Sequence, residues 1–297
     1  MKTKMLSCIM LMMIYAMCAL SGLGSIPPVF TDAKSNPRIP ENFVLVEAES
    51  PTDSTSDLSL NSFYMDKYEL TQAEYQAVMG AWDSDPKNHS KAYGIGDNYP
   101  VYYGSWFNAI EYCNRRSIKE GLTPCYSYDN CGSDSANWPS GWDTINRNQS
   151  NVSCDWTANG YRLPTEAEWI YAAKGGKQSE GYIYSGSNDI KAVAWYNKNN
   201  SPYGAKPVGS KLPNELGIYD MSGNVLEWCW DIYPKGEPIY DVHIYYKKPD
   251  AEDFIERIVH GGCWHYAAIN CTIAKRGHTH AIHSDIGSGF RIVRVAP

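Results

Sequence analysis

The sequence has no excess of basic residues and, after its N-terminus, no long apolar run. The 297 residues include 33 acidic and 26 basic side chains, for a formal net charge of −7. A dedicated binder of nucleic acid or of an anionic membrane surface would need an excess of Lys and Arg. No later segment reaches the roughly 20 apolar residues of a membrane-spanning helix. We therefore expect no nucleic-acid partner and no membrane contact outside the N-terminal segment.

Several common catalytic and metal-binding motifs are also missing. The chain has no Cys-x-x-Cys pair, no Gly-x-Ser-x-Gly nucleophile motif and no Gly-rich phosphate loop. A zinc knuckle, an α/β-hydrolase and a nucleotide-binding loop are thereby disfavoured. Phe is scarce, with 6 residues beside 23 Tyr and 10 Trp. Because Tyr and Trp join an apolar face to a polar tip, this balance suits wet binding surfaces and loop-rich cores.

The N-terminus has the pattern of an export signal. A short basic start precedes an almost wholly apolar run at 5–20, which is too short for a membrane span. We predict an export signal over 1–21, with either cleavage after Ser21 or lipidation of Cys18, and a Pro-rich linker over 22–40. The protein is then exported, as a surface or outer-membrane lipoprotein or in the periplasm, and touches the membrane only through the lipid anchor.

Export makes the cysteines relevant as disulfide candidates. Setting aside Cys8 and Cys18 leaves seven cysteines, so at least one thiol stays free if the others pair. The sequence does not assign the partners.

Local signals indicate a domain of short elements over 41–297. At Thr71 and Thr165 a Thr is followed three residues later by Glu, the pattern of a capping box at a helix start. Ser105 can cap a third helix over 106–118, and strands are expected at 43–46, 217–220, 227–230, 258–262 and 290–295. The polar stretch at about 126–160 is too long for an ordinary loop and indicates an insertion with local structure. Helices and short strands without a βαβ repeat predict a loop-rich α+β fold.

The order of motifs resembles one known family. The segment at 162–169 reads Arg-Leu-Pro-Thr-Glu-Ala-Glu-Trp, the segment at 289–291 reads Gly-Phe-Arg, and further motifs lie at 64–71, 100–106, 207–209, 214–228 and 261–262. Together they are similar to the sulfatase-modifying-factor family, the domain of formylglycine-generating enzyme. The resemblance implies a C-type-lectin-like α+β fold that is rich in loops, which agrees with the elements expected above.

The resemblance also implies a copper-dependent activity that the residues support only in part. Formylglycine-generating enzyme oxidises a substrate cysteine with copper held by two thiolates. Here Cys263 follows the Gly-Gly motif, Tyr266 stands at the first ligand position and Cys271 at the second. A phenol cannot replace a thiolate for Cu(I). We expect no copper and no catalytic residue, and we keep as an alternative an oxidase that uses Cys271 with Cys263. A local disulfide or two inert thiols would also explain this pair.

A calcium site is also implied by the resemblance. Asn224, the carbonyl of Val225 and Glu227 match one family site, and oxygen ligands so close in sequence suit Ca²⁺. The alternative is that Asn224 forms a turn and Glu227 a buried hydrogen bond. The family's second calcium site needs a carboxylate shortly before Pro207, and none occurs at 201–205. We expect that second site to be absent.

The C-terminal segment at 260–291 carries an unusual composition. It contains five of the seven histidines, and fifteen of its positions hold residues that an AAC or AAT asparagine codon can encode after changes to its adenines alone. Lys, Glu, Gln, Met and Trp cannot arise in this way, and none occurs at these positions. The positions are His265, Tyr266, Ala268, Ile269, Asn270, His278, Thr279, His280, Ala281, Ile282, His283, Ser284, Asp285, Ile286 and Ser288. The pattern resembles the variable region of diversity-generating-retroelement target proteins, and most closely that of spirochaete surface proteins.

This pattern predicts non-covalent recognition of an unidentified protein or glycan. A rigid framework would order the segment, and aromatic and small polar side chains would form an adaptable contact surface, with Tyr266 as a central aromatic supported by Trp264. The candidate binding residues are His265, Tyr266, Ala268, Ile269, Asn270, His278, Thr279, His280, Ile282, His283, Ser284 and Asp285. Two further alternatives remain: a transition-metal site on His278, His280 and His283, and an ordinary polar loop.

Overall fold

The described part of the chain combines short strands and four labelled helices with long loops. The computed structural model describes residues 39–48, 60–80, 82, 93–143, 151–234 and 255–296. The predicted export signal and nearly all of the linker lie outside these residues. Residues from Ile39 onward form one compact unit.

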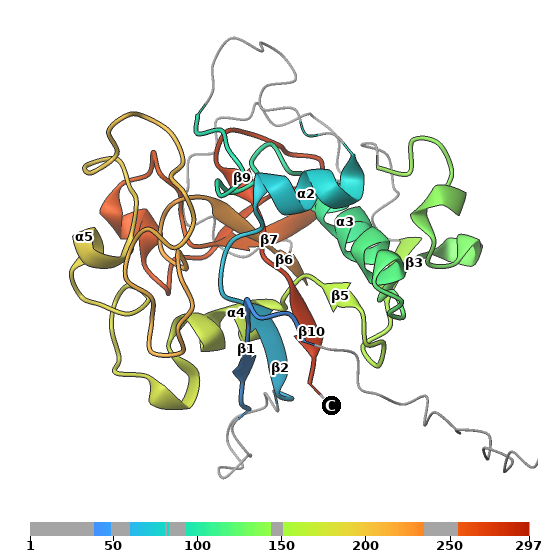
Figure 1. The fold of residues 1–297 in the computed structure, drawn as a ribbon, viewed down its shortest axis with the longest axis horizontal. Helices are drawn as coiled ribbons and strands as arrows, with labels where there is room; N and C mark the ends of the chain where they lie inside the picture. The colour runs from blue at the N-terminus through green and yellow to red at the C-terminus, as the bar shows by residue number, and fades with distance from the viewer. Residues whose placement is uncertain are drawn as a thin grey trace, which may run out of the picture. The chain divides into compact units, whose positions relative to one another are not determined.

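The first sheet joins the two ends of the domain. Its four strands lie in the order β1 (Phe43–Val46), β2 (Phe63–Asp66), β10 (Val293–Val295) and β5 (Tyr161–Arg162), and all neighbours are antiparallel (Figure 1). The C-terminal strand therefore lies between two strands from much earlier in the chain. The strand expected at 43–46 is confirmed at that position.

The second sheet carries the C-terminal segment. Its strands lie in the order β8 (Gly277–His280), β7 (Glu256–His260), β6 (Leu226–Ile232) and β9 (Ser288–Gly289). The β8–β7 and β7–β6 pairs are antiparallel, and β9 runs parallel to β6, with Glu227 opposite Gly289. This pairing brings the family motifs at 214–228 and 289–291 side by side.

All three predicted helix starts are confirmed. Thr71 precedes α2 (Gln72–Met79) and Thr165 precedes α4 (Glu166–Ala173), each in a capping box closed by the Glu three residues on. Ser105 caps α3 (Trp106–Lys119) in a box completed by Asn108. The fourth labelled helix is α5 (Ile190–Val193). The boxes satisfy amides that would otherwise lack partners at the first turn.

The polar stretch after α3 contains a small subdomain of its own. Strand β3 (Tyr126–Tyr128) pairs antiparallel with β4 (Val152–Cys154), and the 3₁₀ turns η1 (Asp129–Cys131) and η2 (Ser135–Asn137) follow β3 in the described part of this stretch. Trp138 and Trp142 meet with their ring centroids 4.5 Å apart, and Trp142 also meets the Phe107 ring of α3. Aromatic packing therefore holds this stretch against the rest of the domain.

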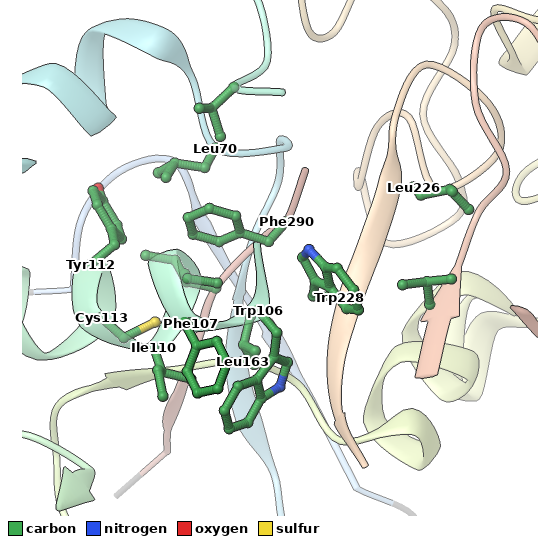
Figure 2. Packing of buried hydrophobic residues seen from close by; sticks show 14 of the residues in the cluster. Leu70, Trp106, Phe107, Ile110, Tyr112, Cys113, Leu163, Leu226, Trp228 and Phe290 are labelled. Atoms are coloured by element: carbon green, nitrogen blue, oxygen red, sulfur yellow. The ribbon is translucent and has the colours of Figure 1, made fainter. Parts of the chain in front are cut away.

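Aromatic side chains dominate the core. Figure 2 shows Trp106, Phe107 and Phe290 gathered with Trp228 beside them, and all four are buried. The indole of Trp228 donates to the carbonyl of Gly104 at 2.8 Å, and that of Trp106 to the carbonyl of Cys229 at 3.2 Å. Because each buried polar tip has an acceptor, a loop-rich interior can use Trp where a regular core would use Phe. The α+β class is confirmed. No helix in the described ranges has the length and apolarity needed to cross a membrane.

Candidate recognition surface

Two loops of the C-terminal segment lie against each other. Loop 261–276 connects β7 to β8 and includes the 3₁₀ turn η5 (Ala268–Cys271), and loop 281–287 connects β8 to β9. The Trp264 indole donates to the carbonyl of Ile286 at 2.9 Å. A Cβ at Gly287 would lie 3.0 Å from Cys263 Sγ and 3.0 Å from the His265 ring. Residues separated by some twenty positions therefore share one surface region.

Each loop is anchored by fully buried residues. Cys263, Trp264 and Cys271 have no exposed surface in loop 261–276, and Phe290 and Arg291 have none beyond β9. Gly262 has a φ of +73°, and a Cβ there would lie 2.5 Å from the carbonyl oxygen of Asn270. Only glycine fits this approach, so the family motif fixes the path of loop 261–276.

Most of the predicted binding positions in these loops reach solvent. Ile269 is 69% exposed. The others with partial exposure are His265, Ala268, Asn270, Ile282, His283, Ser284 and Asp285. In these two loops the framework residues Cys263, Trp264 and Cys271 are buried, whereas these eight codon-patterned positions reach solvent, and this arrangement suits a replaceable contact surface.

The expectation that Tyr266 is a central exposed aromatic is wrong. Its side chain is only 8% exposed and belongs to the main hydrophobic cluster. The His265 ring stands edge-on to it, and the Tyr266 carbonyl accepts a hydrogen bond from the Asn197 amide at 3.0 Å. Tyr266 therefore supports the loop from inside. Trp264, expected as a supporting residue, is indeed fully buried.

The predicted positions on β8 belong to the sheet edge and not to the loops. Thr279 and His280 are buried, and His278 stacks on the Tyr233 ring at a centroid distance of 3.9 Å. His278 Nδ1 lies 2.9 Å from the Glu256 carboxylate, and His280 Nε2 lies 3.9 Å from it. These side chains pack against the sheet's own neighbours, so we remove them from the contact surface.

The histidines do not converge as metal ligands. His278 and His280 flank Glu256, whereas His283 Nε2 lies 3.0 Å from the Asp285 carboxylate in the second loop. Across the ranges that the structure describes, no three His, Cys, Asp or Glu side chains form a group that could hold a metal ion. His278, His280 and His283 therefore do not form the ligand set that the transition-metal alternative requires.

Asp285 organises its own loop. One carboxylate oxygen accepts from the Gly287 amide at 2.9 Å and from the Ser288 hydroxyl at 2.7 Å, and the other meets His283. Burial by itself raises the pKa of this carboxyl, but the hydrogen bonds from His283, Ser288 and Gly287 outweigh it, so the pKa of Asp285 lies below its ordinary value. The carboxylate is therefore committed to ordering residues 283–288.

The two thiols implied by the copper chemistry are buried and protonated. All seven cysteines of the described ranges are free thiols, so Cys263 and Cys271 form no local disulfide. Burial raises the pKa of Cys263 well above its ordinary value and that of Cys271 to about 12. Cu(I) is bound by thiolates, and a buried thiol resists losing its proton. These residues do not fit the copper site, and the structure shows two inert thiols.

Glu227 does not fit the implied calcium site. One of its oxygens accepts from Arg291 at 2.6 Å, and the other accepts from Arg291 at 2.6 Å and from the Trp169 indole at 2.7 Å. Both Glu227 and Arg291 are fully buried. The guanidinium is thus already the cation that faces this carboxylate, and a second cation beside it would be repelled.

Asn224 and Val225 are likewise engaged by the protein itself. Asn224 Oδ1 accepts from the Lys206 amide at 2.9 Å, and its amide group donates to Glu69 at 2.6 Å. The Val225 amide donates to the other Glu69 oxygen at 2.9 Å. Asn224 has a φ of +58°, which is the conformation of a turn residue. Asn224 and Glu227 belong to a turn and a buried hydrogen-bond network, and Glu227, already paired with Arg291, does not fit a calcium ion beside the Val225 carbonyl.

Sequence reasoning missed two carboxylates in this network. Glu69 and Asp220 are both buried beside Arg291 and Glu227; burial raises the pKa of Glu69 above its ordinary value and that of Asp220 to about 6. Glu69 lies 155 positions before Asn224 in the chain. No local pattern could have linked them, because only the tertiary fold brings them together.

Comparison with known proteins places this geometry in a family. The sulfatase-modifying factor enzyme 1-like domain matches residues 31–296. The chain is 38% identical over 283 residues to the chaperone protein LppX of Paenibacillus barcinonensis, covering 87% of this chain and 91% of that protein. The formylglycine-generating enzyme of Bos taurus is 25% identical over 246 residues, covering 71% of this chain and 60% of that enzyme.

A solved structure agrees with both the fold and the resemblance to variable proteins. Treponema denticola variable protein 1 superposes with a TM-score of 0.68 and 32% identity, covering 86% of this chain and 95% of that one. The chain belongs to the sulfatase-modifying-factor family and has the C-type-lectin-like fold of formylglycine-generating enzyme.

Proposed function

We propose that this protein recognises a protein or glycan partner without covalent chemistry, through loops 261–276 and 281–287. The observation that carries the proposal is the division, in these two loops, between buried framework residues and outward residues of types that an altered asparagine codon can encode. Trp264 and Cys271 are fully buried, whereas Ile269 and its neighbours face solvent. Such a division allows the outward residues to change without loss of the fold.

The chemistry of the segment supports binding over catalysis. Cys263 and Cys271 are buried with raised pKa values, and Asp285 is held by its own loop. The remaining outward side chains are aliphatic, imidazole and small polar groups, which contribute contact area and hydrogen bonds. The similarity to Treponema denticola variable protein 1 supports the same role.

The proposal includes export and display at the cell surface. The apolar N-terminal run and Cys18 are the features that favour a lipoprotein. Similarity to the protein named LppX is consistent with this destination. A protein with an adaptable contact surface must reach its partners, and display at the cell surface would give it that access. The predicted export is therefore consistent with the proposed recognition.

Comparative sequencing of the gene from many isolates tests the proposal. Differences should gather at the fifteen codon-patterned positions, while Trp264, Cys271, Phe290 and Arg291 stay constant. A nearly identical, Asn-rich template beside a reverse-transcriptase gene should accompany the gene. Substitutions spread evenly over the domain would refute the proposal, because drift has no preference for adenines at outward positions.

A further inference from the structure

The loop at 200–206 is closed around the ammonium group of Lys206. Its Nζ donates to the side-chain oxygen of Asn200, to the carbonyl of Pro202 and to the carbonyl of Gly204, the last at 2.7 Å. A lysine ammonium has three N–H donors, so all three find acceptors within this one loop. The Lys206 side chain is buried, although a charged group is normally exposed.

The oxygen atoms around this ammonium form a cation site. Two backbone carbonyls and one amide oxygen are the neutral ligands that hard cations take in proteins. Without a positive charge at the centre, these three oxygens would point at one another, and the buried carbonyl of Gly204 would lose its donor. The chain supplies the positive charge at this point covalently.

The backbone of Lys206 is anchored to the buried network described above. Its amide donates to Asn224 Oδ1 at 2.9 Å, and its carbonyl accepts from Asn224 Nδ2 at 3.2 Å. Asn224 is fully buried and also bonded to Glu69. The Lys206 end of the loop is thus fixed to the core, and the hydrogen bonds of its ammonium hold the other end, at Asn200 and Pro202, against it.

The tip of the loop adjoins loop 261–276. Tyr203 is 61% exposed, and its ring stands edge-on to the Trp264 ring with centroids 4.4 Å apart. The Asn200 side chain donates to the Trp264 carbonyl at 3.0 Å. Trp264 in turn contacts His265 and Ile286, one in each proposed recognition loop. Tyr203 therefore stands at the border of the proposed surface, on a neighbouring loop.

We propose that the Lys206 ammonium is a built-in cation that fixes loop 200–206 and so holds Tyr203 as a constant aromatic contact beside the two replaceable loops. Tyr203 lies outside the codon-patterned segment, so it stays the same when that segment changes. A ring already held in place loses little conformational freedom on binding, which makes it an effective anchor for an apolar peptide side chain. The contact role rests on the proposed function, whereas the role of the cation does not.

Hydrogen exchange on the full chain tests the cation. Lys206→Met keeps the length of the side chain and removes its charge, and it should speed amide exchange at 203–206 by about tenfold or more. Lys206 and Lys211 both lie over the Trp195 ring, with Nζ at 5.7 Å and 4.1 Å from its centroid. Lys211→Met is the matched control, because the Lys211 ammonium bonds one carbonyl, that of Lys191. Unchanged exchange in Lys206→Met would overturn the role of the cation.

Chemical rescue separates a cation from mere packing. Lys206→Ala leaves the oxygens without their ammonium, so methylammonium, K⁺ or Ca²⁺ should restore protection at 203–206 in a saturable manner. The same ions should leave the wild-type loop unchanged. If no ion restores protection in Lys206→Ala, the ammonium does not act as a replaceable cation and the inference fails.

Peptides selected from a random display library on the immobilised wild-type protein test the contact. Tyr203→Ala should weaken their binding by about tenfold, while Tyr203→Phe retains most of it. Ile118→Ala is the control, because it removes an exposed apolar side chain from α3, outside the proposed recognition loops. Ile118 lies twelve residues after Trp106, which is about 18 Å along the helix axis. Weakening by Ile269→Ala but not by Tyr203→Ala overturns this contact and leaves the proposed function standing. Weakening by Tyr203→Ala but not by Ile269→Ala or His265→Ala would overturn the proposed function and leave the Tyr203 contact standing.

Discussion

The Arg291 guanidinium and the Glu227 carboxylate form a two-bond ion pair, with both N–O distances 2.6 Å and neither side chain exposed. Arg291 also donates to the carbonyl of Asp66 at 3.1 Å and to that of Tyr219 at 2.9 Å. One side chain thus ties together three segments that are far apart in sequence, at Asp66, at 219–227 and at Arg291 itself. In a fold with little regular structure, such a charge-assisted pair holds together segments that are not joined by long strand pairings.

Removing the guanidinium should destabilise the whole domain. Arg291→Met leaves Glu227 as an unpaired buried carboxylate, which typically costs about 3–5 kcal/mol of unfolding free energy. Arg291→Lys should also be poorly tolerated, because one ammonium cannot reproduce the two parallel bonds. Urea unfolding would measure both. The double variant Glu227→Gln/Arg291→Met should lose less than the two single changes added together, and simple additivity would contradict the coupling.

The cap of α3 should contribute measurably to stability. Ser105→Ala removes the hydroxyl that accepts from the Asn108 amide at 3.1 Å, at the start of the helix that carries Trp106. Loss of such a cap costs about 1 kcal/mol. Ser127→Ala, whose hydroxyl bonds only Ser153 at an exposed position, is the control and should stay within about 0.5 kcal/mol of wild type. The measurement is unfolding in guanidinium, and equal unfolding midpoints for Ser105→Ala and Ser127→Ala would argue against the capping role.

Asp285 should give the second recognition loop a pH dependence. Its pKa is lowered in the folded protein, so its contribution to stability is present above the unfolded-state pKa of about 3.9 and is lost as the pH falls through the folded value. Asp285→Asn should therefore be less stable than wild type near neutral pH, and the difference should shrink in acid. Thermal unfolding of both proteins from about pH 7 to pH 3 measures this gap. A gap that stays constant with pH would mean that the charge is unimportant.

The buried thiols should be unreactive in the native state. With a pKa of about 12, Cys271 has only about one thiolate in ten thousand molecules near pH 8, and it is fully buried as well. Iodoacetamide should label the partly exposed Cys131 well before Cys263 or Cys271, as mass spectrometry of the peptides would show. All should react after unfolding in guanidinium. Rapid labelling of native Cys271, or its protection by added copper, would revive the oxidase alternative.

Local signals were sufficient for much of the fold. Ser105, Thr71 and Thr165 each mark a helix start because a cap depends on residues no more than three positions away. The strand at 43–46 was also placed correctly. The strand expected at 217–220 is wrong, because this segment forms a turn with Asn214, and the last strand proved shorter than expected, Val293–Val295 in place of 290–295. There Phe290 and Arg291 are used for core packing and for the ion pair, and they leave the ladder.

The candidate surface was predicted only in part. The codon pattern separated inward Trp264 and Cys271 from outward Ile269. It could not show that Tyr266 and His280 are buried, since nothing in a list of residue types says which way each side chain faces. Lys206 was not recognised at all, because its acceptors become visible only once the loop has closed around it.

The sequence by itself determined the family and the helix starts, and it predicted a division of the C-terminal segment into framework and contact positions. These properties are local or lie in the order of motifs. The tertiary structure alone decided what the charged groups do: Arg291 faces Glu227, and Lys206 faces the carbonyls of its own loop. The physical reason is that electrostatic partners are chosen by distance in space, and in a loop-rich domain the contacting groups come from segments that sequence spacing does not relate.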